Sequence, residues 1–73
     1  MNANDPQITL YVNGEARSVP AETTVARLVE SLELGQRRIA IELNGEVVPR
    51  SEHASRSLND QDRIEIIRAI GGG

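Results

Sequence analysis

The sequence of 73 residues contains no cysteine, no lysine, no phenylalanine and no tryptophan, and Tyr11 is its single tyrosine. Because cysteine is absent, neither disulfides nor thiolate metal ligands can stabilise so small a chain. No stretch approaches the roughly 20 apolar residues that a membrane-spanning helix needs, and the polar start MNANDPQ is not a secretory signal. We therefore expect a soluble cytoplasmic protein that contacts no membrane.

The charged residues exclude a second class of function. Eleven acidic side chains and eight arginines give a net charge of −3, and the arginines form no basic cluster with aromatic residues between them. Nucleic-acid binders normally carry a clustered basic excess together with aromatic platforms on which bases stack. We therefore expect no nucleic-acid partner.

Side chains suited to catalysis or metal binding are scarce. His53 is the only histidine, it lies in a polar connection, and neither a cysteine nor a Gly-x-Ser-x-Gly nucleophile accompanies it. Asp60 and Asp62 are two residues apart, but the glycine and the distal glutamate of a calcium loop are missing. We interpret His53 as an ordinary surface residue and the two aspartates as turn residues, and we predict neither an enzyme nor a metal site.

Two Asn-Gly pairs predict the tight turns of two hairpins, because both residues tolerate the positive φ angles that such turns require. They are Asn13-Gly14 and Asn44-Gly45. Apolar and polar residues alternate before each pair with the two-residue period of a half-buried strand, and the alternation resumes near the end of the chain. The strands predicted in this way span residues 8–12, 15–19, 39–43, 46–48 and 63–68.

One helix is predicted between the two hairpins. Thr24 is suited to cap its first turn, and Gly35 stands where a left-handed residue would close it. Residues 50–59 have no clear period and are interpreted as a connection with one helical turn around residues 51–55. The apolar stripe of the helix has the i, i+3, i+4, i+7 spacing of one buried face and consists of Val25, Leu28, Val29 and Leu32.

These elements predict an α+β fold in which a mixed sheet of four to five strands packs on one helix. The first and the last strand carry the densest apolar runs, so we expect them side by side and parallel at the centre of the sheet. The domain is predicted to span residues 7–68. Residues 1–6 are expected to form a flexible lead, and residues 69–73 a flexible glycine tail.

The chain closes on the sequence AIGGG, and this tail offers the one group suited to chemistry. A glycine tail without side chains can enter a narrow channel in another protein, where any Cβ atom would collide with the walls. The carboxylate of Gly73 is unreactive as it stands, but adenylation by ATP would turn it into an anhydride with a good leaving group. A frayed end is the alternative interpretation of the three glycines.

Residues 7–73 resemble the ThiS family of sulfur carriers in thiamin biosynthesis. The resemblance is carried by the segments ITLYVNGE, TTVARLVESL, AIELNGEVVPRSEH and LNDQDRIEII and by the terminal glycines. It implies the ubiquitin-like β-grasp fold, whose order of elements is the one predicted above. An aromatic residue is common in the family where His53 stands, and the polar lead is longer than usual.

The resemblance also implies a carrier function for the tail. Gly73 would be adenylated by a ThiF-like activating enzyme that uses ATP, and would become a C-terminal thiocarboxylate with sulfur from a sulfur-donating enzyme. A ThiG-like thiazole synthase would then take the sulfur. Gly72 would be the required narrow neighbour, Gly71 would add reach, and the chain itself would bind no cofactor.

Two other functions are open from the sequence. A MoaD-like carrier for molybdopterin synthesis would use the same tail chemistry, although the short connection over residues 50–59 favours the ThiS family. A ubiquitin-like module that binds its partners without covalent chemistry would not need the tail.

An apolar partner surface is the last candidate site. Val48 and Ile67 are its candidate members. Arg50 and Arg68 are candidates for its rim. The alternative is that the two apolar residues belong to the core, which is typical of β-branched residues in short strands.

Overall fold

The computed structural model describes residues 6–34 and 38–68. Five strands, one α-helix and one 3-10 helix form in this part of the chain. Every predicted strand is confirmed, and each strand boundary lies within one residue of the expected one. The elements are β1 Gln7–Val12, β2 Glu15–Pro20, α1 Val25–Ser31, β3 Ile39–Leu43, β4 Glu46–Val48, η1 Arg50–Glu52 and β5 Arg63–Arg68.

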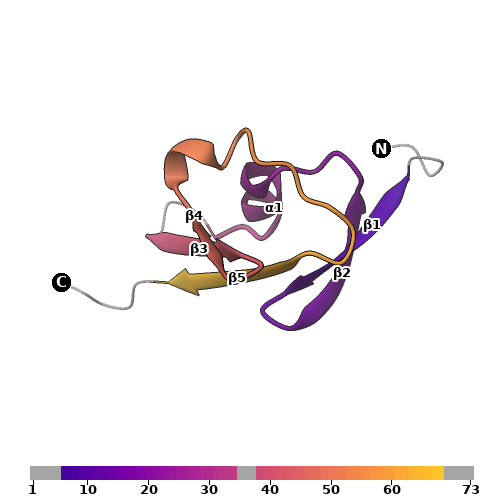
Figure 1. Ribbon diagram of the computed structural model, residues 1–73, viewed down its shortest axis with the longest axis horizontal. Coiled ribbons are helices and arrows are strands. Elements are labelled where there is room, and N and C mark those ends of the chain that lie inside the picture. Colours follow the sequence, from indigo (N-terminus) through magenta and orange to yellow (C-terminus); the bar gives the residue numbers. More distant parts are fainter. Residues whose placement is uncertain (1–5, 35–37, 69–73) are drawn as a thin grey trace.

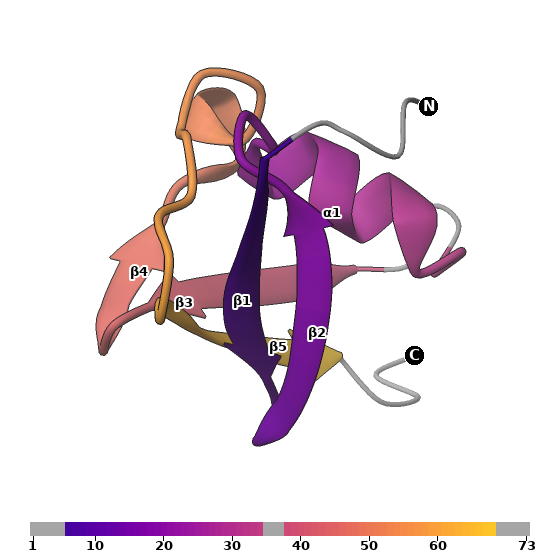
Figure 2. The same ribbon diagram turned by 90° about the vertical axis from the view of Figure 1, so that its right-hand side faces the viewer.

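The five strands form one mixed sheet in the order β2-β1-β5-β3-β4. β1 and β5 run parallel, and the other neighbours run antiparallel. This confirms that the first and the last strand lie side by side, with β5 at the centre. Helix α1 covers the inner face of the sheet, and within the described residues no second layer covers the outer face (Figures 1 and 2).

Both Asn-Gly turns have the predicted backbone geometry. The φ angles are 50° and 87° for Asn13 and Gly14, and 52° and 88° for Asn44 and Gly45. Positive φ at two consecutive residues gives a two-residue turn the twist that antiparallel strands require. The two hairpins β1-β2 and β3-β4 therefore close where the sequence predicts them.

The core lies between α1 and the inner face of the sheet. Alternating strand residues and the helical stripe supply almost all of it, as their periods predict. Leu58 is an addition from the connection before β5, and its backbone N–H donates to the Thr23 carbonyl at 3.0 Å, beside the start of the helix. The buried apolar side chains of the described residues are Leu10, Val12, Val25, Leu28, Ile41, Leu43, Val48, Leu58 and Ile64.

Helix α1 begins as predicted and ends earlier. Thr24 Oγ1 accepts a hydrogen bond from the Arg27 N–H at 3.2 Å, which confirms Thr24 as the N-terminal cap. The helix ends at Ser31, and Glu33, with a φ of 55°, adopts the left-handed conformation. Gly35, where this conformation is predicted, lies outside the described residues. In the part of the chain that is described, no helix is long and apolar enough to cross a membrane.

Candidate functional site

The tail that follows strand β5 is the predicted site of the carrier chemistry. Gly71, Gly72 and Gly73 lie outside the described residues, so their roles stay predictions. The strand that precedes them is described: β5 ends at Arg68, at the end of the molecule opposite the start of β1 (Figure 1). The contacts that hold β5 therefore set the point from which the tail starts.

Both hairpin turns hold strand β5 through their asparagines. Asn44 Oδ1 accepts a hydrogen bond from the Arg63 N–H at 2.9 Å, and the Asn44 N–H donates to the Arg63 carbonyl at 2.8 Å. Asn13 Oδ1 accepts from the Ile66 N–H at 2.8 Å, and the Asn13 N–H donates to the Ile64 carbonyl at 2.9 Å. Each asparagine thus gives β5 two hydrogen bonds in addition to forming its own turn.

The carboxylates of Asp60 and Asp62 fix the turn that leads into β5. Asp60 Oδ1 accepts a hydrogen bond from the Thr9 N–H at 2.7 Å. Asp62 Oδ2 accepts from the Asn59 N–H at 2.7 Å, and Asp62 Oδ1 accepts from Asn44 Nδ2 at 3.0 Å. Both carboxylates are occupied by donors of the protein itself, which confirms them as turn residues. Among the described residues, no three side chains of the metal-ligating types gather.

His53 is less exposed than the interpretation as an ordinary surface residue requires. Its side chain is partly buried, and Nε2 lies 3.1 Å from the Val48 carbonyl oxygen, which accepts a hydrogen bond from it. The His53 carbonyl accepts from the Ala26 N–H at 2.9 Å. The interpretation is corrected because η1 turns the chain back over β4, and His53 there joins β4 to the start of helix α1.

Val48 is wrong as a member of an exposed partner surface. It is 2% exposed and belongs to the core, because it pairs with Ile41 of β3, whose side chain points to the inner face. Its neighbour Val47 points to the opposite face and is 66% exposed. On β5, the same alternation leaves Ile67 49% exposed, so the partner-surface interpretation survives for Ile67 and not for Val48.

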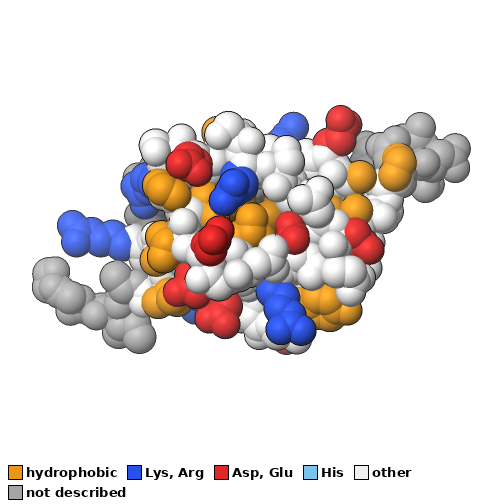
Figure 3. Space-filling view, viewed as in Figure 1, with side chains coloured by type: hydrophobic (Ala, Val, Ile, Leu, Met, Phe, Trp, Pro, Cys, Tyr) orange, Lys and Arg blue, Asp and Glu red, His pale blue; other side chains and the backbone are white. Residues whose placement is uncertain are grey.

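The exposed apolar side chains share the outer face of the sheet near the end of β5. Ile67 pairs with Ala40 of β3, and Val47 pairs with Glu42, which in turn pairs with Glu65 of β5. Figure 3 shows hydrophobic and acidic side chains next to one another at this end of the molecule. We call Ala40, Val47 and Ile67 the outer patch.

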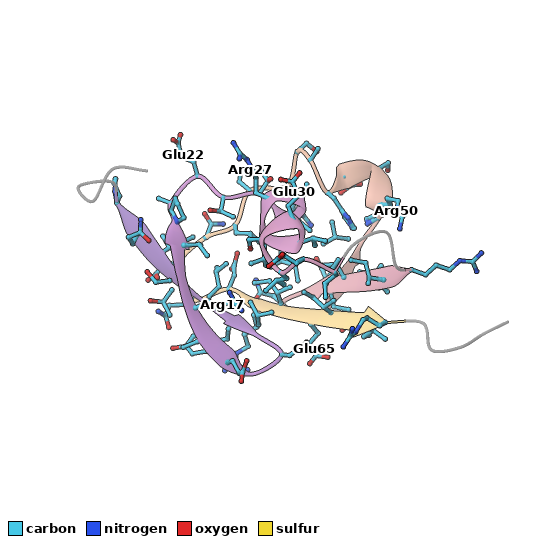
Figure 4. The ribbon with its side chains drawn as sticks, turned by 180° about the vertical axis from the view of Figure 1, so that it is seen from behind. Arg17, Glu22, Arg27, Glu30, Arg50 and Glu65 are labelled. Carbon is cyan, nitrogen blue, oxygen red and sulfur yellow. The ribbon has the colours of Figure 1, made fainter. Side chains whose placement is uncertain are left out.

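The two predicted rim arginines lie at the same end of the molecule but in different layers. Arg68 is exposed at the end of β5, directly after Ile67. Arg50 is exposed on η1, which Figure 4 shows on the helix side of the sheet, above the tip of β5. Because side chains alternate along β5, the Arg68 side chain points to the face opposite to Ile67, so the structure does not bring these two side chains to one face, and Arg50 also lies on the helix side.

Alanine substitutions of the two neighbouring valines of β4 should separate core from surface. Val48→Ala is expected to lower the free energy of unfolding by about 2 kcal/mol, because it removes two buried methyl groups and leaves a cavity. Val47→Ala is expected to change it by less than about 0.5 kcal/mol, because the side chain is mostly exposed. Urea unfolding measures both, and equal losses would contradict the placement of these side chains.

The similarity to known proteins extends over almost the whole chain. The family model of the ThiS family matches residues 6–73. The chain belongs to the ThiS family. One relative, the sulfur carrier protein ThiS of Escherichia coli (strain K12), is 34% identical over 64 residues, which are 88% of this chain and 97% of that protein.

The fold of this chain is similar to that of a solved ThiS structure. The crystal structure of a thiamine biosynthesis protein (ThiS) from Geobacter metallireducens matches with a TM-score of 0.78 and 32% sequence identity. The match covers 90% of this chain and 100% of that one. This confirms the β-grasp fold that the resemblance to the ThiS family implies.

A third relative is a much longer protein. It is the thiazole synthase of Paramagnetospirillum magneticum (strain ATCC 700264 / AMB-1), which is 44% identical over 64 residues. Those residues are 88% of this chain, and the chain spans only 20% of the length of that thiazole synthase. A ThiS-like segment is therefore part of a larger polypeptide there.

Proposed function

We propose that the chain is a sulfur carrier protein of thiamin biosynthesis, and that the sulfur travels as a thiocarboxylate on Gly73. The observation that carries the proposal is the match of the ThiS family to residues 6–73, on a β-grasp domain whose last strand leads to the terminal glycines. The E. coli relative, of which the match covers 97%, is a sulfur carrier protein. The chain is accordingly a carrier and not a catalyst.

The chemistry of the tail needs an activating enzyme, because a carboxylate is a poor acyl donor. In a ThiF-like partner, a carboxylate oxygen of Gly73 would attack the α-phosphate of ATP, which forms an acyl adenylate and releases pyrophosphate. A sulfide equivalent from a sulfur-donating enzyme would then attack the acyl carbon and expel AMP, leaving the thiocarboxylate. Because Gly72 and Gly73 carry no Cβ, the reacting carbonyl stays open to attack. ATP is thus a substrate of the partner rather than a cofactor of the chain.

Two relatives favour thiazole formation as the destination of the sulfur. The thiazole synthases of Paramagnetospirillum magneticum and Magnetococcus marinus each contain a segment similar to this chain, at 44% and 34% identity. A segment joined covalently to its partner is present there at a high effective concentration. We infer that a ThiG-like synthase accepts the sulfur from Gly73, which favours thiazole formation over molybdopterin synthesis.

The outer patch is the proposed docking surface for these partners, and Arg68 follows Ile67 at the end of β5 with its side chain on the opposite face. Five residues follow Arg68, and an extended chain of that length spans about 17 Å. A partner whose active site receives Gly73 has to approach the end of β5 to within this distance, and the outer patch lies there. Exposed apolar side chains with polar neighbours are typical of such surfaces. Arg50 faces the same end of the molecule from the helix layer and offers a second contact.

Ile67→Ala is expected to raise the Kd for the activating enzyme about three- to tenfold, because it removes the apolar side chain nearest the tail from the outer patch. The matched control is Arg27→Ala, which lies on the exposed side of helix α1 (Figure 4) and should bind as the parent chain does. Titration calorimetry measures both values. Equal Kd values for the two variants would remove the outer patch from the docking surface.

An intact-mass measurement tests the proposed function. The chain is incubated with ATP, a ThiF-like enzyme and a sulfur source, and the expected product has one oxygen replaced by sulfur. Fragmentation should place this replacement on Gly73. The E. coli ThiS protein serves as the positive control, and an unchanged mass of this chain beside a converted control would show that the carrier function is wrong.

A further inference from the structure

Strand β5 pairs with its two neighbouring strands over unequal lengths. β3 pairs with every residue of β5 from Ile64 to Arg68. β1 pairs with β5 only as far as Ile64, because the Asn13-Gly14 turn then leads the chain away into β2. Among the described residues, the last part of β5 therefore has a strand on one side only, and Figure 1 shows the lower side of the yellow strand near its tip without a neighbouring strand.

The main-chain groups of alternate β5 residues point to opposite sides of the strand. The Arg63 carbonyl accepts a hydrogen bond from the Asn44 N–H, so the odd-numbered residues of β5 face β3. The Ile64 carbonyl accepts from the Asn13 N–H, so the even-numbered residues face the side of β1. Both main-chain groups of Ile66 and Arg68 consequently point to the side on which β1 has ended.

The Asn13 side chain occupies the first position on this side that β1 no longer reaches. Its Oδ1 accepts from the Ile66 N–H at 2.8 Å, where the carbonyl of a longer strand would stand. The next groups on the same side are the Ile66 carbonyl and the Arg68 N–H. Within residues 6–34 and 38–68, no strand or side chain pairs with these two groups, which we call the open edge.

We propose that an extended main-chain segment of the protein that receives the tail pairs with the open edge and adds a strand to the sheet beside β5. This inference rests on the proposed function, because it concerns the protein that accepts Gly73. Unpaired N–H and C=O groups at a sheet edge are a template for a further strand. The open edge ends at Arg68, so a strand added here fixes the direction in which the five remaining residues enter the partner.

The added strand also lies next to the outer patch. Ile67 points from β5 to the outer face and is 49% exposed, so it would contact an outward side chain of the added strand. In strand addition, main-chain hydrogen bonds supply affinity and the alternate side chains supply selectivity. The open edge and Ile67 provide these two contributions on three consecutive residues.

A second copy of this chain is the poorer occupant. Two β5 strands paired edge to edge would offer each other only residues 66–68, a length of about 10 Å. Stable interfaces bury about 1,200–2,000 Å² in total, which so short a pairing does not reach. A partner that also encloses the five tail residues gains the missing contact area from them.

Arg68→Pro is the variant that removes the N–H of the open edge. Because the N–H of residue 68 points away from β3, the proline leaves the hydrogen bonds between β3 and β5 in place. Arg68→Ala is the matched control, since it removes the side chain and keeps the N–H. We expect Arg68→Pro to raise the Kd for a ThiG-like synthase about five- to tenfold above that of Arg68→Ala. Equal Kd values overturn the proposal.

Amide hydrogen exchange is a second test of the added strand. It is measured on the unmodified chain, so it does not require that a variant folds. The Arg68 amide should exchange about tenfold more slowly in the complex with the synthase than in the free chain. An unprotected amide overturns the proposal, and so does a dimer of the free chain, seen by sedimentation, that Arg68→Pro disrupts. The intact mass of the same samples tests the proposed function separately. If the Arg68 amide is protected but the chain is never converted to the thiocarboxylate, the strand addition is supported and the sulfur-carrier function is refuted.

Discussion

Removing Gly72 and Gly73 is expected to abolish thiocarboxylate formation while leaving the stability of the domain unchanged. The carboxylate of the new terminus would stand about 7 Å short of the position that Gly73 reaches in the activating enzyme. A displacement of about 1 Å can already cost about 100-fold in rate, so no reaction should be measurable. In the described part of the chain the buried core residues precede Arg68, and the two removed residues carry no side chain, so the free energy of unfolding should change by less than about 0.5 kcal/mol. Intact mass and urea unfolding measure the two effects.

Gly72→Ala is the control that separates the effect of tail length from the effect of the missing side chains. It keeps the length of the tail and its carboxylate but adds a Cβ atom next to the reacting residue. We expect conversion to slow by about 100-fold if the partner's channel is as narrow as proposed, and Gly71→Ala to have a smaller effect. A truncated chain that still supports thiazole formation would instead identify a module that binds its partners without covalent chemistry.

The features of the fold that could be predicted are those with a local signal. The two Asn-Gly turns form as expected because tolerance of positive φ is a property of the residues themselves. The two-residue period locates each strand to within one residue, since one buried face produces the period whatever the neighbouring strand is. The resemblance to the ThiS family is confirmed on the same ground, because short segments carry it.

Strand β4 shows where a local signal is insufficient. Its three residues are too few to establish which of two adjacent valines points inward. The register between β3 and β4 decides this by pairing Val48 with Ile41, and it leaves Val47 on the outer face. The end of helix α1 is a similar case, because Glu33 takes the left-handed conformation before the chain reaches a glycine.

The contacts that position the candidate site depend on the whole fold. The hydrogen bond from the Ile66 N–H to Asn13 joins residues 53 positions apart, and the one from the Thr9 N–H to Asp60 joins residues 51 positions apart. No period or motif indicates such pairs, because they exist only once the strand order is fixed. The sequence could therefore predict the glycine tail, whereas the open edge beside it follows from the unequal pairing of β5 with β1 and β3.

Ile64→Ala is expected to destabilise the domain more than any substitution on the outer face. Ile64 is 1% exposed and lies on the central strand, paired with Val12 of β1 and with Leu43 of β3. Shortening it leaves a cavity between the helix and the sheet, and such changes typically cost about 2–5 kcal/mol. A domain of 73 residues has a free energy of unfolding of only about 4–11 kcal/mol, so a large part of its stability would be lost.

Ile67→Ala is the matched control for stability, because it changes the same residue type on the same strand but on the outer face. We expect Ile67→Ala to lower the free energy of unfolding by less than about 1 kcal/mol. Equal decreases for both variants in urea unfolding would contradict the sheet arrangement. Ile64→Ala and the truncation of Gly72 and Gly73 also differ in how they lose function. Ile64→Ala should lose thiocarboxylate yield in proportion to its unfolded fraction and regain it when saturating partner stabilises the folded form. Truncation of Gly72 and Gly73 should not be rescued by any partner concentration, because the reacting carboxylate itself is displaced.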